Sequence, residues 1–191
     1  MENLLEKCFK VGQNPNHRLG TLDRQAGLNE TSDVTLEPLL LYGQHPVKVD
    51  SKNRLGMPAD VRQRIKAESH GKDFFLIVGH NRRPWLYPDK FYEALVNQTQ
   101  SDLTPGTEMS DFDRMSLALA EWVELDAQGR VQIPVRSLNW TGIQPTQEFF
   151  LIGVRDHLEL WDKTEWENER KALLERGPDI VARARQARQA Q

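Results

Sequence analysis

One pattern occurs twice in this chain, and the repetition limits the possible folds more than any other feature of the sequence. The first copy reads VKVDSKNRLGMP over residues 47–58, and the second reads VELDAQGRVQIP over residues 123–134. The residues that agree in spacing are an aspartate, an arginine and a proline, namely Asp50, Arg54 and Pro58 in one copy and Asp126, Arg130 and Pro134 in the other. This agreement predicts two copies of one structural unit.

Further matched segments extend each copy of the repeat. Residues 74–77 and 149–152 both read FFLI, and each copy closes on Asp-Lys shortly after an aromatic residue, Tyr87 in the first copy and Trp161 in the second. We therefore expect a first unit at 41–94 and a second unit at 119–171, joined by a connector at 95–118. Within the connector, residues 101–106 are rich in turn formers and residues 110–120 have the pattern of a capped helix.

The repeated pattern itself predicts two short strands around a tight turn. Apolar and polar residues alternate at 123–125 and at 131–133, which is the period of a strand. An aspartate side chain accepts a hydrogen bond from the backbone two residues on, and Gly and Asn tolerate positive φ. We interpret four residues as turn-forming, namely Asp50, Asn53, Asp126 and Gly129.

The rest of each unit reads as a helix, a β-hairpin and a second helix. The expected segments are helices at 59–67 and 135–140, apolar strands at 74–78 and 149–154, and return strands at 83–87 and 157–161. Asp89 and Asp162 are predicted N-caps of helices that extend to about residues 97 and 174. One such unit buries little core alone, so we expect both to pair their hairpins about a pseudo-twofold axis in one α+β, β-rich body.

The two ends of the chain differ from the repeats. Residues 1–40 show little periodicity, and we predict an N-terminal extension that is mostly disordered. Residues 172–191 form an Arg-rich tail with a helical pattern. A solvated helix and a nucleic-acid contact are both open for this tail.

The net charge of −3 conceals an asymmetry. Residues 43–94 carry 10 basic and 6 acidic side chains, whereas residues 119–171 carry 6 and 10. A basic segment in an acidic chain indicates an anionic partner there, and an Arg-rich solvated surface is the alternative. The single cysteine, Cys8, excludes an internal disulfide framework, and no apolar run is long enough for a membrane span. We expect a soluble, cytoplasmic protein without metal or cofactor.

The doubled turn, the proline after it and the closing aromatic-Asp-Lys resemble the MraZ family of bacterial transcriptional regulators. The resemblance covers about residues 41–171 and includes Leu41-Tyr-Gly43 at its start. It implies two tandem AbrB/SpoVT-like swapped-hairpin units that form a pseudo-twofold β-barrel with short flanking helices. It also implies a ring-shaped homo-oligomer, associated with the nucleoid, that binds double-stranded DNA at direct repeats in the promoter of the division and cell-wall gene cluster.

The resemblance carries over to the arginines of the two turns. Arg54 and Arg130 match the DNA-contacting arginine of the family, and Lys52 matches the basic residue that often precedes it. Two positions depart from the family pattern, because Asn53 replaces a glycine and Gln128 replaces the usual lysine. From charge alone, the predicted basic surface around the first turn also includes Lys48, Arg62 and Arg64. The alternative for both turn arginines is an ion pair with the aspartate of the same turn, and this ion pair is compatible with DNA contact.

Two other classes of function compete with a DNA-binding regulator. An enzyme lacks support, because the five histidines are scattered and no metal-ligand spacing, phosphate-binding glycine loop or nucleophile elbow occurs. An interaction or scaffold module of the same fold is the second alternative, given the acidic second unit and its tryptophans Trp140, Trp161 and Trp166. These tryptophans also suit a core or a subunit interface.

Overall fold

A computed structural model describes residues 37–98 and 106–189 of the chain. The predicted extension at 1–40 therefore lies outside the described residues except for its last four, and the turn-rich stretch at 101–106 lies outside except for Gly106. In the last part of the extension, Leu39 is buried and the Glu37 carboxylate bonds to Lys66 and Ser69. Residues 37–39 thus contact the first repeat.

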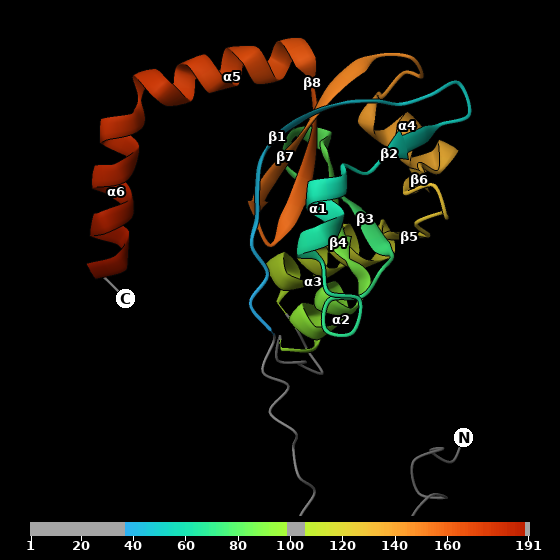
Figure 1. Ribbon diagram of the computed structural model, residues 1–191. Coiled ribbons are helices and arrows are strands. Elements are labelled where there is room, and N and C mark those ends of the chain that lie inside the picture. The colour runs from blue at the N-terminus through green and yellow to red at the C-terminus, as the bar shows by residue number, and fades with distance from the viewer. Residues whose placement is uncertain (1–36, 99–105, 190–191) are drawn as a thin grey trace, which may run out of the picture. The chain divides into compact units, whose positions relative to one another are not determined.

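The described strands form a six-stranded antiparallel sheet in the order β1-β7-β8-β4-β3-β5 and a separate two-stranded sheet of β2 and β6 (Figure 1). The strands of the larger sheet are β1 (Leu41–Lys48), β3 (Phe74–Val78), β4 (Pro84–Pro88), β5 (Glu121–Val123), β7 (Glu148–Arg155) and β8 (His157–Asp162). The smaller sheet consists of β2 (Arg54–Gly56) and β6 (Arg130–Gln132). The α+β class predicted from the sequence is confirmed.

The two predicted hairpins are present as β3–β4 and β7–β8. Each apolar strand pairs with the strand that follows it, so that Leu76 lies opposite Leu86 and Leu151 lies opposite Leu160. The hairpins join through β4 and β8, where Leu86 faces Leu158. These leucines are at most 2% exposed, so the centre of the sheet is also the centre of the core. Each edge strand pairs with a strand of the other repeat, since β1 of the first repeat pairs with β7 of the second and β5 of the second pairs with β3 of the first.

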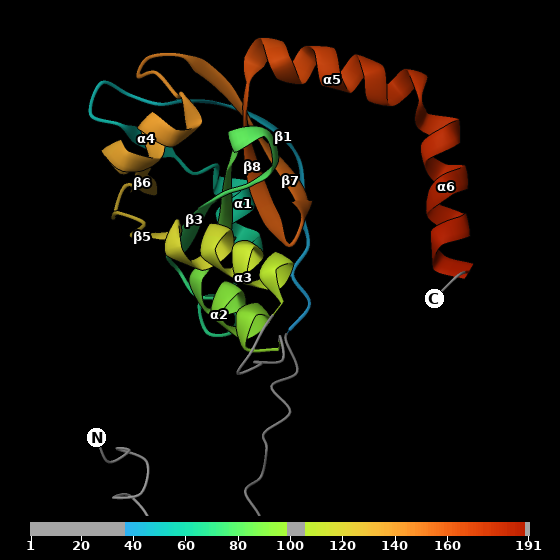
Figure 2. The ribbon, with the colours of Figure 1, turned by 180° about the vertical axis from the view of Figure 1, so that it is seen from behind.

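The described part of the chain also contains six α-helices, one 3-10 turn and one π-helical turn (Figures 1 and 2). The helices are α1 (Ala59–Arg64), α2 (Asp89–Asn97), α3 (Thr107–Asp113), α4 (Val135–Thr141), α5 (Lys163–Glu175) and α6 (Gly177–Gln189). The 3-10 turn is η2 (His80–Arg82), and the π-helical turn η3 (Arg114–Ala118) follows α3 directly. Helix α2 lies beside the stretch formed by α3 and η3 (Figure 2). The Tyr92 hydroxyl of α2 donates to the Ser116 carbonyl of η3 at 2.6 Å.

Proline residues set the start of α1 and α4, as predicted. Pro58 and Pro134 occupy the position before each helix in an extended conformation, with ψ of 142° in both. Helix α1 ends at Arg64, earlier than predicted, because Ile65 is extended. Helices α1 and α4 therefore begin at equivalent positions of the two repeats, directly after the proline that follows β2 or β6.

The two predicted aspartate caps behave differently. The Oδ1 atom of Asp162 accepts from the backbone of Thr164 at 2.8 Å and of Glu165 at 3.1 Å, which confirms this N-cap. The prediction for Asp89 is wrong, because α2 begins at Asp89 itself and no side-chain cap bond forms. The residue before the helix is Pro88, and the Asp89 backbone donates to the Asp73 carbonyl at 2.9 Å.

A closed barrel is not found among the described strands. The larger sheet is an open row whose edge strands are β1 and β5. Strands β2 and β6 have only three residues each and bond to one another. Within the described ranges, single bridges from Val49 to Leu55 and from Leu125 to Val131 connect this pair to the strands before it, so the ladder does not continue around to close a barrel.

Candidate nucleic-acid interface

The first turn, Asp50–Arg54, is organised by its aspartate. The Oδ1 atom of Asp50 accepts from the backbone of Lys52 at 2.8 Å and of Arg54 at 2.9 Å. The Oδ2 atom accepts from Arg54 Nε at 2.8 Å and forms an ion pair with Arg54 Nη2 at 2.7 Å. Asn53 has a φ of 60°, in the left-handed region that asparagine tolerates. One carboxylate therefore fixes both the turn and the arginine that ends it.

The second turn, Asp126–Arg130, has the same arrangement. The Oδ1 atom of Asp126 accepts from the backbone of Gln128 and of Arg130, each at 2.9 Å. Its Oδ2 atom accepts from Arg130 Nε at 2.9 Å and Nη2 at 2.7 Å. Gly129 occupies the position of Asn53 and has a φ of 75°. The ion pair considered from the sequence thus exists in both turns.

The two turns are held together by strands β2 and β6. Leu55 lies opposite Val131 in this ribbon, and both are 0% exposed. Because side chains alternate along a strand, Arg54 and Arg130 leave the ribbon on the opposite, outer face. Their side chains are 28% and 32% exposed. The ribbon therefore presents two braced guanidinium groups on one face.

Reciprocal backbone bonds fix each turn to the strand beyond the other. The Met57 backbone donates to the Gly129 carbonyl at 2.8 Å, and the Ile133 backbone donates to the Asn53 carbonyl at 2.8 Å. Neither turn can move without breaking a bond to the other repeat. The spacing of the two arginines is thus set by the backbone.

The braces keep both aspartates ionised. The hydrogen bond from the Arg54 side chain lowers the pKa of Asp50 to about 2. The equivalent bond from Arg130 lowers the pKa of Asp126. At neutral pH each turn therefore contains a carboxylate and a guanidinium in contact.

Arg62 lies beside the second turn, although the sequence placed it with the first. Its Nε donates to the Met57 carbonyl at 3.2 Å. A Cβ atom built on Gly129 would lie 2.9 Å from Arg62 Cζ, so the guanidinium covers this glycine. The φ of 75° favours glycine at position 129, and a Cβ there would displace the flexible end of the Arg62 side chain. The second turn gains a cation that its own repeat does not supply.

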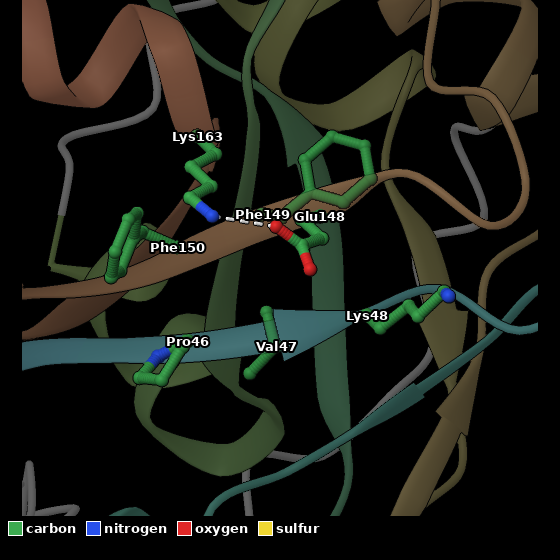
Figure 3. A pocket seen from close by; sticks show the side chains of 7 residues that line it. All are labelled: Pro46, Val47, Lys48, Glu148, Phe149, Phe150 and Lys163. Atoms are coloured by element: carbon green, nitrogen blue, oxygen red, sulfur yellow. Dashed lines mark hydrogen bonds and ion pairs between the residues drawn. The ribbon is translucent and has the colours of Figure 1, made fainter.

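The other predicted basic residues differ in their surroundings. Arg64 stacks over the Tyr42 ring at 3.9 Å and lies 3.5 Å from Asp60. Lys48 ends β1 beside a pocket of about 340 Å³, in which Lys163 Nζ lies 2.7 Å from Glu148 (Figure 3). The Lys48 side chain points away from that ion pair (Figure 3). The described contacts therefore associate Lys52 with the first turn and Arg62 with the second, and they engage Arg64 elsewhere.

Two glutamines, Gln128 in the second turn and Gln132 in β6, contact the turns and were not among the predicted site residues. Gln128 Oε1 accepts from Arg130 Nη2 at 2.9 Å. Gln132 Nε2 donates across the ribbon to the Lys52 carbonyl at 2.7 Å. Aligning the repeats could have identified Gln128, because it occupies the position of Lys52, whereas Gln132 aligns with Gly56 and the repeat gives no signal for it.

The described residues, 37–98 and 106–189, contain no group of three or more His, Cys, Asp or Glu side chains arranged to hold a metal ion. Within the same ranges, every helix is too short or too polar to traverse a lipid bilayer.

Comparison with known proteins identifies the family. A family model described as "MraZ protein, putative antitoxin-like" matches residues 117–181. A relative from Dehalococcoides mccartyi named "Transcriptional regulator MraZ" is 30% identical over 143 residues, which is 74% of this chain and 96% of the relative. Proteins of the same name from Thermomicrobium roseum and Caldicellulosiruptor bescii are 28% identical over 144 residues and 32% identical over 130 residues. They share 75% and 68% of this chain, and 96% and 86% of their own lengths. The chain therefore belongs to the MraZ family of transcriptional regulators, which are not enzymes.

Proposed function

We propose that this chain is a sequence-specific DNA-binding regulator that contacts direct repeats in promoter DNA through the arginines of its two turns. The observation that carries the proposal is the pair of braced guanidinium groups on one face of the β2–β6 ribbon. A two-stranded ribbon fits the major groove, and arginine bonds to phosphate or to guanine O6 and N7. The named relatives are transcriptional regulators, which supports this use of the ribbon.

We also propose that residues 41–94 and 119–171 are two tandem AbrB/SpoVT-like swapped-hairpin units related by a pseudo-twofold axis. In the repeat, β1 corresponds to β5, β3 to β7 and β4 to β8. The sheet order is β1-β7-β8-β4-β3-β5. Replacing each strand by its counterpart gives β5-β3-β4-β8-β7-β1, which is the same order read from the opposite edge, as a twofold relation requires. The reciprocal bonds between the turns follow the same exchange.

Local charge supports the proposal although the whole chain is acidic. Lys52 is exposed close to Arg54, and Arg62 adds a cation beside Gly129 of the second turn. These charges attract phosphate independently of the net charge of −3, because fields are screened within about 10 Å at moderate ionic strength. Binding that depends on such contacts weakens steeply as salt rises.

Multiple copies are part of the proposed function. One ribbon offers few contacts, and linked ribbons gain effective concentration on repeated DNA sites. A ring-shaped homo-oligomer acting on direct repeats would supply this gain, in the cytoplasm at the nucleoid. Exposed apolar side chains on several elements are consistent with subunit contacts, namely Phe112, Met115, Trp122, Leu173 and Leu174. The promoter of the division and cell-wall gene cluster is the proposed target.

Retention on DNA-cellulose tests this function against a scaffold role. We expect the full chain to bind at low salt and to elute as salt rises, because phosphate contacts release counterions. The Arg54→Ala/Arg130→Ala variant should elute earlier than the Arg170→Ala/Lys171→Ala variant, which removes the same charge from exposed positions on α5. An intact oligomer that flows through at low salt would favour the scaffold and contradict DNA binding.

A further inference from the structure

The two turns differ in how much of each arginine is already engaged. Lys52 and Gln128 occupy the same position in the repeat, two residues before the arginine. The amide oxygen of Gln128 accepts a bond from Arg130 Nη2 at 2.9 Å. Lys52 cannot make this contact, because an ammonium group has no acceptor. The guanidinium of Arg130 therefore has one more partner than that of Arg54.

This difference decides which hydrogens remain available. A guanidinium has five N–H donors, one on Nε and two on each Nη. Arg130 Nη2 bonds to Asp126 at 2.7 Å and to Gln128 at 2.9 Å, so both of its hydrogens are used. Arg54 contacts Asp50 through Nε and Nη2 among the described residues, which leaves one Nη2 hydrogen and both Nη1 hydrogens.

The remaining hydrogens suit different ligands. Bidentate recognition of guanine O6 and N7 needs one hydrogen from each of two adjacent nitrogens. Arg54 can offer such a fork from Nη1 and Nη2 while it stays bonded to Asp50. Arg130 can offer only Nη1 unless Gln128 moves away, and two hydrogens on one nitrogen suit a phosphate oxygen. Arg62 beside Gly129 adds a positive charge to the second turn.

We propose that the turns have unequal tasks, with Arg54 reading a guanine in the major groove and Arg130 holding phosphate because Gln128 occupies its fork. The inference rests on the proposed function, since it concerns how the same ribbon binds DNA. Gln128 is then a positioning residue that limits what Arg130 reads. Asp126 orients the guanidinium of Arg130, and Gln128 accepts the Nη2 hydrogen that a bidentate contact with guanine would need.

Selection from random duplex DNA tests the unequal tasks of Arg54 and Arg130 and requires no known operator sequence. The full-length chain, Arg54→Lys, Arg130→Lys and Gln128→Ala are each incubated with a duplex library of random sequence, and the bound DNA is sequenced. Lysine keeps the charge and removes the fork. We expect Arg54→Lys to lose about tenfold or more of the preference for one guanine in each repeat, while Arg130→Lys retains that preference. Gln128→Ala should add or strengthen a guanine preference at a second position.

The outcomes separate failure of this inference from failure of the proposed function. If the full-length chain binds and enriches a motif, equal losses of guanine preference in Arg54→Lys and Arg130→Lys overturn the unequal tasks. An unchanged motif in Gln128→Ala also overturns them. If the full-length chain enriches no sequence, the proposed function itself fails and the inference fails with it. The variants change exposed or half-exposed side chains, and matching unfolding curves would show that folding is unaffected.

Discussion

The side chain of Arg130 bonds to the carboxylate of Asp126 through two nitrogens, Nε at 2.9 Å and Nη2 at 2.7 Å. The same carboxylate also accepts two backbone N–H groups of its turn. The position of the guanidinium is therefore tied to the backbone conformation of the turn. The equivalent contact in the first turn makes this relationship a repeated property of the chain.

Replacing Asp126 by asparagine should separate orientation from charge in DNA binding. The Asp126→Asn variant raises the net charge by one and removes the ionic brace, so non-specific affinity should rise while discrimination between sequences falls. Competition binding with specific and random duplexes measures both. Asp179→Asn, on the exposed face of α6, adds the same charge and serves as control. A discrimination ratio that is equal in the two variants would argue against an orienting role for Asp126.

Gly129→Ala should lower the free energy of unfolding more than a surface substitution. The φ of 75° costs a residue with a Cβ about 1–2 kcal/mol, and Arg62 Cζ would lie 2.9 Å from that Cβ. Urea unfolding measures the loss. Adding Arg62→Ala should recover the steric part, whereas Asn53→Gly at the equivalent position should have a smaller effect. No loss in Gly129→Ala would show that this turn tolerates a different backbone.

The Asp50 carboxyl should titrate with a pKa of about 2 in the folded chain, because the Arg54 side chain stabilises its ionised form. Since this pKa lies below the ordinary value of 3.8, the brace is complete above pH 3.8 and is lost as the pH falls toward 2. Carbon-13 NMR of the carboxyl group follows the titration. In Arg54→Ala the midpoint should move up toward 3.8. A wild-type midpoint already near that value would contradict the brace.

His157 should make the stability of the fold depend on pH near neutrality. Burial lowers the pKa of His157, but hydrogen bonding to Asp156 at 2.6 Å and the nearby Glu159 carboxylate outweigh burial, and the pKa lies above 6.5. The contribution is therefore complete below pH 6.5 and is lost as the pH rises through the higher folded-state pKa. Chemical unfolding at a series of pH values measures it. His157→Gln should flatten this dependence, and an equal slope in both proteins would exclude His157 as its source.

The repeat was sufficient to predict much of this fold, because strands, turns and hairpins follow from local spacing. The Asp–Arg pairs were foreseeable for the same reason, since both partners lie within one turn. Local spacing did not predict that β2 and β6 pair as a separate two-stranded sheet instead of closing a barrel, because this pairing depends on how the two repeats contact each other. The place of Arg62 beside Gly129 depends on the same meeting of repeats, and helical periodicity assigns a residue only to a face. The bond from Arg130 to Gln128 depends on a rotamer, which spacing does not specify.

DNA contact by the two turns can be tested by comparing two variants of equal charge on a promoter fragment with direct repeats. Arg54→Ala/Arg130→Ala removes both turn arginines, and Arg170→Ala/Lys171→Ala removes two exposed cations of α5. Fluorescence anisotropy at matched salt gives the two dissociation constants. We expect the turn variant to bind at least about thirtyfold more weakly than the α5 variant, because each arginine contact contributes about 1–3 kcal/mol. Dissociation constants within about threefold of each other, a difference below about 1 kcal/mol, would contradict DNA contact by the two turns.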